Sequence, residues 1–268
     1  RVRGHASAPP SMRLAGGMGA LIDALHRRLD PARVVTGFDV RQLRIDGTDV
    51  TITGAGIDGA VDTWRARHVL LAVPPRLAAH RIGFEPALPA ESTRQWLATP
   101  TWMAPHAKYV AVYDVPFWRE DGLSGSARSA LGPMVEIHDA TMPGGSAALF
   151  GFLGVPAHVR QSVPEAVLLT ACRAQLARLF GPTAATPKAD MFKDWAQDPL
   201  TATPADLHDA SHPVGGLSAW ASSGPWQQLL TGIASEWSQQ FPGYVAGAVE
   251  AAGSGVERLA GCLSASAA

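Results

Sequence analysis

The apolar positions along the chain follow two different periods, which predicts a mixture of helices and strands. After Gly16-Gly17, apolar residues recur with helical spacing and predict a helix with one apolar face. That face consists of Leu21, Ile22, Leu25 and Leu29. Residues 39–45 and 49–53 have the composition of strands, and the Asp46-Gly47 pair between them is a strong hairpin signal. We therefore expect a helix and then a β-hairpin near the start of the chain.

The remainder of the chain predicts further short strands and two long helices. The apolar run within residues 68–73 predicts a strand buried on both faces, ended by Pro74-Pro75. Strands are also expected at residues 109–113, 134–137 and 147–152, the last two joined by a turn at residues 142–145. Helices are expected around Trp96 and over residues 164–180 and 244–259, whereas residues 196–232 are rich in loops. Mixed short strands and helices fit an α/β or α+β fold.

Composition narrows the class of protein. Of 268 residues, 47% are hydrophobic, which is enough for a sizeable core in one large or two small domains. With 22 Lys+Arg against 23 Asp+Glu, the net charge is -1, so we expect no nucleic acid as the main partner. No apolar run reaches the ~18 residues of a membrane span. Cys172 and Cys262 lack the spacing of a zinc site, and so few cysteines favour a reducing, cytoplasmic location.

One cluster of possible metal ligands gives only weak evidence for a metal site. His138 lies between Glu136 and Asp139, but alternation along a strand places Glu136 and His138 on one face and Asp139 on the other. We therefore expect a hydrogen-bonded histidine and no metal site.

Seven short blocks, in order, resemble the later part of the flavin-containing amine oxidase family, the monoamine and polyamine oxidase group. The blocks are LAGGM (14–18) with the helix after it, FDVRQLRID (38–46), AVPP (72–75), FEPALP (84–89), HAKY to VPFW (106–118), Trp195, and ASE (234–236) with PGYVAGA (242–248). The resemblance covers roughly residues 12–262. It implies a mixed α/β fold: a partial GR2-like FAD-binding domain and part of a substrate domain with a mixed β-sheet flanked by helices.

The resemblance also implies a domain division. Residues 1–11 would be a lead-in, 12–84 and 196–268 the middle and C-terminal segments of the FAD-binding domain, and 85–195 the substrate-binding domain. The family's GxGxxG segment has no counterpart here, so the chain resembles roughly the later 55–60% of such an enzyme. We therefore expect a fragment or one chain of a split enzyme, with an upstream chain carrying GxGxxG as a partner.

The same resemblance assigns candidate site residues. Lys108 would hold a water at flavin N5 and assist the reaction with oxygen; the alternative is a surface lysine on an edge strand. Tyr244 would form one wall of an aromatic cage; the alternative is core packing. The N–H groups of Tyr244 and Val245, at a helix start, would stabilise reduced flavin. The expected cofactor contacts are Val40, Trp195, Ser235, Glu236, Gly243, Tyr244 and Val245.

The implied activity is oxidation of a small-molecule amine to an imine, with oxygen as acceptor and hydrogen peroxide as product. FAD is expected to be non-covalent, because residues 201–204 read Thr-Ala-Thr-Pro where flavinylated relatives carry a cysteine. Two alternatives remain open: a dehydrogenase or desaturase of the same superfamily acting on a non-amine substrate, and a flavin-free interaction subunit.

Overall fold

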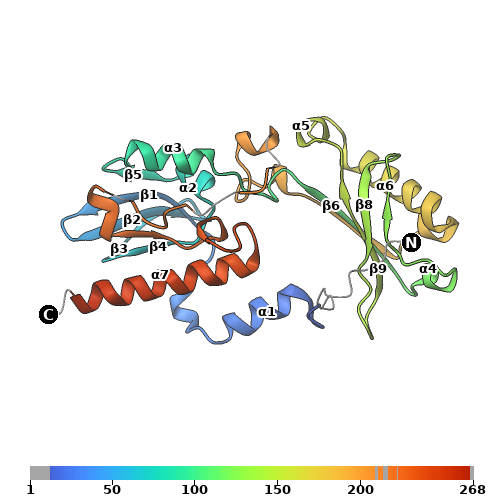
Figure 1. Ribbon diagram of the computed structural model, residues 1–268, viewed down its shortest axis with the longest axis horizontal. Helices are drawn as coiled ribbons and strands as arrows, with labels where there is room; N and C mark the ends of the chain where they lie inside the picture. The colour runs from blue at the N-terminus through green and yellow to red at the C-terminus, as the bar shows by residue number, and fades with distance from the viewer. Residues whose placement is uncertain (1–12, 209–210, 214–216, 222, 266–268) are drawn as a thin grey trace.

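The two larger β-sheets, each with its own hydrophobic core, lie side by side along the long axis of the molecule, and a third sheet has two short strands (Figure 1). The computed structural model describes residues 13–208, 211–213, 217–221 and 223–265. The expected lead-in at residues 1–11 lies outside the described residues. The mixed α/β fold predicted from the sequence is confirmed.

The first sheet begins with the predicted hairpin. Its strand order is β3-β2-β1-β5, with β1 (Phe38–Asp46), β2 (Asp49–Gly56), β3 (Val61–Ala66) and β5 (Gly83–Glu85). β1 and β2 pair antiparallel, and Gly47 turns the chain between them with a φ of 65°. The hairpin is therefore confirmed, whereas β3 and β5 lie outside the predicted strands.

The predicted strand at residues 68–73 is shorter than expected. Only β4 (Val69–Leu71) forms, and it pairs parallel with β11 (Leu230–Gly232) from the loop-rich part of the chain. The chain leaves the strand before Pro74-Pro75, as expected, and Pro75 begins α2 (Pro75–Arg81). Proline is compatible with the first position of a helix, where its missing N–H would be unpaired anyway.

The first core joins segments from both ends of the chain. It contains Leu43 and Val50 of the hairpin together with Trp96, Trp226 and Trp237. Trp96 lies on α3 (Ala90–Ala98), and α7 (Val245–Ala265) packs close to the short helix at Ser235–Trp237. The domain boundary expected after residue 84 stays a prediction; Trp96, beyond it, packs in this core.

The second sheet is antiparallel in all four pairings and has the order β10-β6-β9-β8-β7. Its strands are β6 (Ala107–Tyr113), β7 (Ala127–Arg128), β8 (Met134–Asp139), β9 (Ala147–Leu153) and β10 (Ala189–Asp194). Its helices are α4 (Phe117–Glu120), α5 (Ala157–Arg160) and α6 (Glu165–Phe180). The three predicted strands and the α6 helix are confirmed, and the loop Met142–Gly145 is closed by a hydrogen bond of 3.0 Å.

Burial alternates strictly along β6. Ala107, Tyr109, Ala111 and Tyr113 are buried, and they pack in a core with α6 residues such as Leu176. Lys108, Val110 and Val112 are half-buried on the opposite face. One face of this sheet therefore forms the core, and the other, here called the open face, is available for function.

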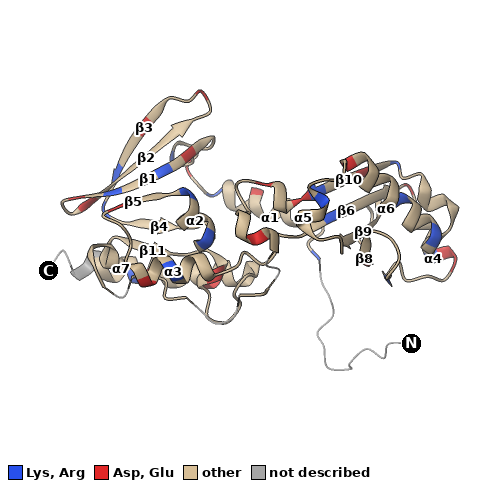
Figure 2. Cartoon of the chain, turned by 90° about the horizontal axis from the view of Figure 1, so that it is seen from above, with Lys and Arg blue, Asp and Glu red and all other residues tan. Residues whose placement is uncertain are grey.

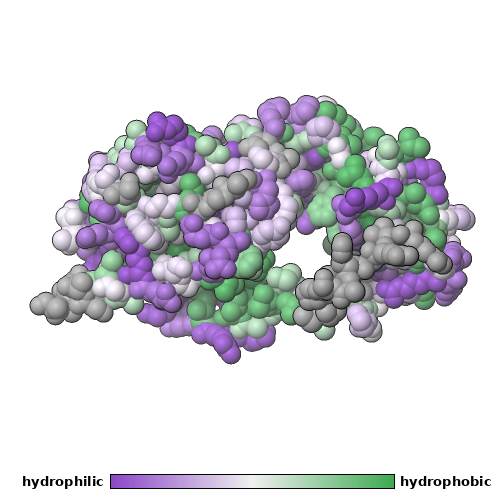
Figure 3. Space-filling model, viewed as in Figure 1, coloured by the Kyte–Doolittle hydropathy of each residue, from purple (hydrophilic) through white to green (hydrophobic). Residues whose placement is uncertain are grey.

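The predicted helix after Gly16 is confirmed as α1 (Gly17–His26), but its apolar face is not buried. Ile22 and Leu25 are 59% and 54% exposed, and hydrophobic residues show as green at the position of α1 in Figure 3. Arg13, just before α1, donates to the Asp139 carbonyl at 2.7 Å. Amphipathic spacing identified the helix but did not predict what covers it.

Basic and acidic residues are interspersed over both halves of the molecule (Figure 2). Within the described ranges, no helix is long and apolar enough to cross a bilayer.

Candidate functional site

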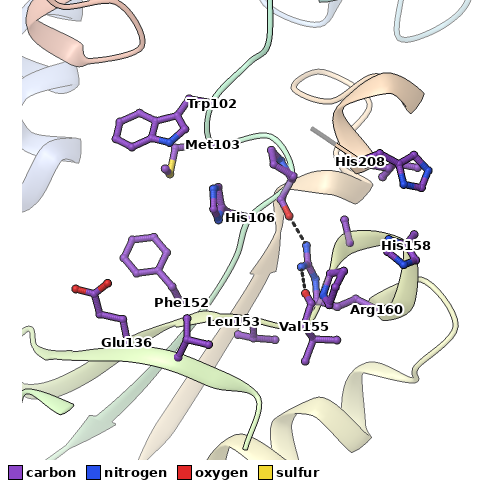
Figure 4. A pocket seen from close by; sticks show the side chains of 16 residues that line it. Trp102, Met103, His106, Glu136, Phe152, Leu153, Val155, His158, Arg160 and His208 are labelled. Carbon is purple, nitrogen blue, oxygen red and sulfur yellow. Dashed lines mark hydrogen bonds between the residues drawn. The ribbon is translucent and has the colours of Figure 1, made fainter. Parts of the chain in front are cut away.

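A pocket of about 660 Å³ lies where β6 begins and β9 ends (Figure 4). Its walls come from the segment before β6, the start of β8, and the turn from β9 into α5. His106 and Phe152 lie close together, with Glu136 on one side and His158 and His208 on the other. The walls are mainly apolar, with a few polar groups, as is typical of small-molecule sites.

A buried ion pair supports one wall of the pocket. Arg160 of α5 binds Asp194 through two hydrogen bonds of 2.8 and 2.6 Å, and both side chains are almost fully buried. The same guanidinium donates to the Pro105 carbonyl at 2.7 Å. Arg160 thus joins α5, β10 and the segment before β6, and its charge is compensated by Asp194.

His106 has a ring nitrogen without a partner. Its Nε2 is buried and has no hydrogen bond within the described part of the chain, and its ring lies 6.3 Å from that of Phe152. Burial lowers the pKa of His106, and the positive charges of Arg160 and Lys108 lower it further. His106 is therefore neutral near pH 7.

Lys108 lies on the open face of the second sheet. Its Nζ is 4.9 Å from the centre of the Phe152 ring, a cation–π contact. β6 is bordered by β10 and β9, so the alternative of a lysine on an edge strand is wrong. The alternation along β6 explains why a lysine is tolerated in an apolar strand: its side chain is on the half-buried face and not in the core.

Trp195 lies beside the start of β6. Its backbone N–H donates to the His106 carbonyl at 3.1 Å, and the Lys193 ammonium is 4.6 Å from the centre of its indole ring. Lys193 is the direct cross-strand neighbour of Lys108 and also pairs with Asp198 at 2.6 Å. The structure therefore brings Trp195 and Lys108 to the same end of the sheet.

The start of α7 gathers most of the other predicted residues. The Gly243 N–H donates to the Ser235 carbonyl at 3.4 Å, and Gly243 has a φ of 79°. One expectation is wrong here: the Tyr244 N–H is not free, because it donates to the Phe241 carbonyl at 3.1 Å. The helix begins at Val245, whose N–H belongs to the first turn, where N–H groups have no partner inside the helix.

Glu236 points into the protein. It is 4% exposed, and its carboxylate accepts from the Ser235 hydroxyl at 3.1 Å. Burial raises the pKa of Glu236. Val40 lies on β1 in the first sheet, where it packs against the first core, so it is in the other half of the molecule from Lys108.

Sequence reasoning missed the neighbours of Tyr244. The Tyr244 ring lies 5.0 Å from Trp102 and 5.3 Å from His212, and those two rings are 4.3 Å apart. Trp102 also lines the pocket, so this aromatic cluster connects the start of α7 with His106. The three residues are distant along the chain, and no local pattern relates them.

The expected arrangement around His138 is confirmed. His138 Nε2 and Glu136 Oε1 are 2.9 Å apart on one face of β8. Asp139 instead accepts hydrogen bonds from Trp118 and Arg119.

Comparison with known proteins identifies the family. The family model of flavin-containing amine oxidoreductases matches residues 5–260. The chain belongs to this family. It is 28% identical over 256 residues to a probable flavin-containing monoamine oxidase A of Dictyostelium discoideum, a match that covers 89% of the chain. It is also 27% identical over 257 residues to putrescine oxidase of Kocuria rosea, covering 86% of the chain.

Solved structures of amine oxidases share the fold. Putrescine oxidase bound to putrescine superposes with a TM-score of 0.72 at 25% identity, covering 91% of this chain and 53% of the other. Cyclohexylamine oxidase from Brevibacterium oxydans gives a TM-score of 0.72 at 25% identity, covering 92% and 52%. The chain spans about half the length of the relatives it matches: the matches cover 51% of the Dictyostelium discoideum protein and 50% of the Kocuria rosea putrescine oxidase.

The residues present fit the flavin that gives the family its name. The first turn of α7 has N–H donors. Gly243 adopts a left-handed conformation, and a Cβ built there would lie 3.3 Å from Pro213 and 3.5 Å from Trp102, so glycine lets the backbone approach closely at this point. Neither cysteine offers a covalent attachment at this place: Cys172 is buried in the second core, and Cys262 lies near the far end of α7.

Proposed function

We propose that this chain is the substrate- and flavin-contacting portion of an enzyme that oxidises a small-molecule amine to an imine. Oxygen would be the acceptor and hydrogen peroxide the product. The placement of Lys108 carries the proposal. Its ammonium has no ion-pair partner among the described residues and lies on the open face, close to the Phe152 ring. Pocket residue His106 directly precedes the same strand. An ammonium held in this way can stabilise negative charge that develops beside it.

FAD, held non-covalently, is the proposed cofactor. The residues that would hold it are Val40, Trp195, Ser235, Glu236, Gly243, Tyr244 and Val245. When bound, the flavin accepts a hydride equivalent from the substrate and passes electrons to oxygen. The first-turn donors from Val245 onward would stabilise negative charge on the reduced ring, and Lys108 would hold a water near it.

The protein's own contribution would be to bind and desolvate the amine. Trp102 and Phe152 present aromatic surface at the pocket, and the Tyr244 ring packs against Trp102. A dry aromatic surrounding disfavours the charged form of an amine. Neutral His106 and the compensated Arg160–Asp194 pair add no net positive charge that would repel the substrate.

The enzyme would also need polypeptide beyond these residues. The chain spans about half of its relatives, and the apolar face of α1 is exposed. We propose that a polypeptide carrying a GxGxxG segment covers this face and completes the FAD-binding domain. The domain ranges 12–84, 85–195 and 196–268 belong to the same proposal, as does a cytoplasmic location, which the small number of cysteines favours.

A second candidate is a dehydrogenase that uses an acceptor other than oxygen. Residues of this chain are 33% identical over 129 positions to an L-amino acid dehydrogenase of Synechocystis, covering 46% of the chain. Lys108 favours the oxidase, because the proposed role of its ammonium is in the reaction with oxygen.

An absorbance spectrum of the purified natural protein tests the proposal, together with mass spectrometry of every polypeptide present. Flavin bands near ~370 and ~450 nm are expected, with peroxide released on addition of an amine. A colourless protein that stays colourless with added FAD would exclude the enzyme and favour a flavin-free subunit. Flavin reduction by an amine without peroxide release would favour the dehydrogenase.

Replacing Lys108 by Met tests the residue that carries the proposal. The variant should fold, because Lys108 lies outside the core, and should lose about 10²-fold in the rate of flavin reoxidation by oxygen. Stopped-flow mixing of the reduced natural enzyme with oxygen measures this rate. Lys193→Met is the control: it removes the neighbouring ammonium and should change the rate less than about threefold. Equal effects of the two variants would contradict the role of Lys108.

A further inference from the structure

Two histidines lie next to each other at one side of the pocket. His158 belongs to α5, and His208 is the last residue of the short 3₁₀ helix Pro204–His208, which contacts α5. Their ring centres are 5.3 Å apart, with an angle of 31° between the ring planes. Figure 4 shows the two rings side by side, on the opposite side of the pocket from Glu136. Two segments that are distant in sequence thus present one imidazole each to the same place.

The nitrogens of these two imidazoles are available to a ligand. Both histidines are exposed, and neither forms a hydrogen bond or an ion pair within the described part of the chain. Imidazole is the commonest metal ligand among protein side chains. The charge of Arg160, on the same helix as His158, is compensated by Asp194 and therefore opposes a bound cation only weakly.

Buried ion pairs fix both of the elements that carry the histidines. Arg160 of α5 binds Asp194, and both side chains are almost fully buried. Asp206 of the 3₁₀ helix binds Arg76 at 2.6 Å and is itself fully buried. Ligands held on elements that are fixed in this way bind a metal with little rearrangement of the protein.

The separation of the two rings matches a shared metal ion. Metal–nitrogen bonds are about 2.0–2.1 Å long, so two imidazoles on one tetrahedral metal have ring centres about 5 Å apart. The observed 5.3 Å is close to this value. In the described ranges, no group of three or more His, Cys, Asp or Glu side chains is placed to hold a metal, so water would complete the coordination. Nitrogen ligands favour Cu²⁺, Ni²⁺ and Zn²⁺ over Mg²⁺ and Ca²⁺.

We propose that His158 and His208 together bind one late divalent transition-metal ion, which bridges α5 and the helix Pro204–His208. This site is separate from the proposed reaction and needs neither a flavin nor an amine. The unfolded chain does not hold the two rings together, so the bound ion stabilises the folded protein. It also ties together two segments that line the pocket.

Isothermal titration calorimetry with Zn²⁺, on natural protein first treated with a chelator, tests the inference. We expect a binding step that His158→Gln and His208→Gln each weaken about tenfold or more, because either change removes the bridge. The double variant should bind little more weakly than either single variant. Zn²⁺ should also raise the midpoint of thermal unfolding of the wild type, and should raise it less in both single variants.

Two controls separate the bridged site from general metal binding. His80→Gln removes an exposed histidine of α2 and should leave Zn²⁺ binding unchanged. Mg²⁺ in place of Zn²⁺ should give no binding step, because Mg²⁺ prefers oxygen ligands. Absence of Zn²⁺ binding, or binding that survives in either single variant, would overturn the proposal. Independent, additive losses from the two substitutions would also overturn it, because they indicate two separate single-histidine sites.

Discussion

At the scale of single residues, two buried ion pairs hold the segments that form the site. Arg160 and Asp194 are 2% and 4% exposed at their side chains, and Arg76 and Asp206 are 5% and 0% exposed. Asp206 also accepts from the Thr203 hydroxyl at 2.7 Å. Both pairs position loops that border the described pocket.

Asp194→Asn should destabilise the protein by about 3–5 kcal/mol at pH 7, because it leaves the Arg160 charge buried and uncompensated. Burial alone would raise the pKa of Asp194, but the hydrogen bonds and charge of Arg160 hold it below its ordinary value. The pair therefore stabilises the wild type above about pH 4, and this contribution is lost as the pH falls through the lowered pKa. Urea unfolding between pH 3 and 7 should show a shallower acid loss in the variant.

Asp114→Asn is the matched control for that experiment. Asp114 pairs with Lys188 at 2.6 Å, but the two side chains are 74% and 67% exposed. We expect a loss of less than about 1 kcal/mol. If both variants lost the same stability, the Arg160–Asp194 pair would have no special structural role.

At the scale of secondary-structure elements, the start of α7 depends on close backbone packing. Gly247 is buried, and a Cβ built there would lie 2.0 Å from the Phe241 carbonyl oxygen. Phe241 also accepts the Tyr244 N–H, so the turn before the helix and its first turn are packed against each other. Position 247 thus requires glycine because the Phe241 backbone leaves no space for a Cβ atom, and not because the residue has an unusual φ.

Gly247→Ala should lower stability by about 1–3 kcal/mol, because the new methyl group forces the first turn away from Phe241. Gly253→Ala, later in the same helix, is the control, since nothing lies within 4 Å of the Cβ it would add. That change should stabilise the protein by about 0.5–1 kcal/mol through helix propensity. Thermal unfolding measures both, and opposite signs are expected; two changes of the same sign would contradict the packing argument.

At the scale of the whole molecule, the apolar face of α1 is without a cover from the described residues. Met18, Ile22, Leu25 and Leu29 are all more than half exposed, and α1 has no buried residue. The helix is ten residues long, which is short for independent stability in water. An apolar stripe of this kind marks an interaction surface.

The chain by itself should associate through this stripe. The double variant Ile22→Lys and Leu25→Lys should reduce concentration-dependent association, because it places two charges in the stripe. Sedimentation velocity at several protein concentrations measures the change. Leu131→Lys, at a position 69% exposed elsewhere on the surface, is the control and should leave association as it is. Unchanged association in the double variant would show that α1 is not the contact.

Local sequence determined the elements whose signals lie within a few residues. Asp46-Gly47 specified the hairpin between β1 and β2, and Pro164 and Gly181 mark the two ends of α6. Such signals are local, because turns, caps and amphipathic spacing depend on residues close by in the sequence. Order along the chain also carried the family resemblance, which the match over residues 5–260 confirmed. Lys108 and the start of α7 became candidate site residues through the order of the resembling sequence blocks, without any knowledge of their contacts.

Only the tertiary structure decided how these elements meet. The short strands β5, β10 and β11 form because a partner strand supplies their hydrogen bonds, and no pattern within three to six residues specifies that partner. The same holds for the site: Tyr244, Trp102 and His212 come together from three separate segments, and Lys108, Phe152 and Glu136 form one row through strand register. Periodicity determines which face of an element is apolar; long-range packing determines what that face touches, as the exposed α1 helix demonstrates.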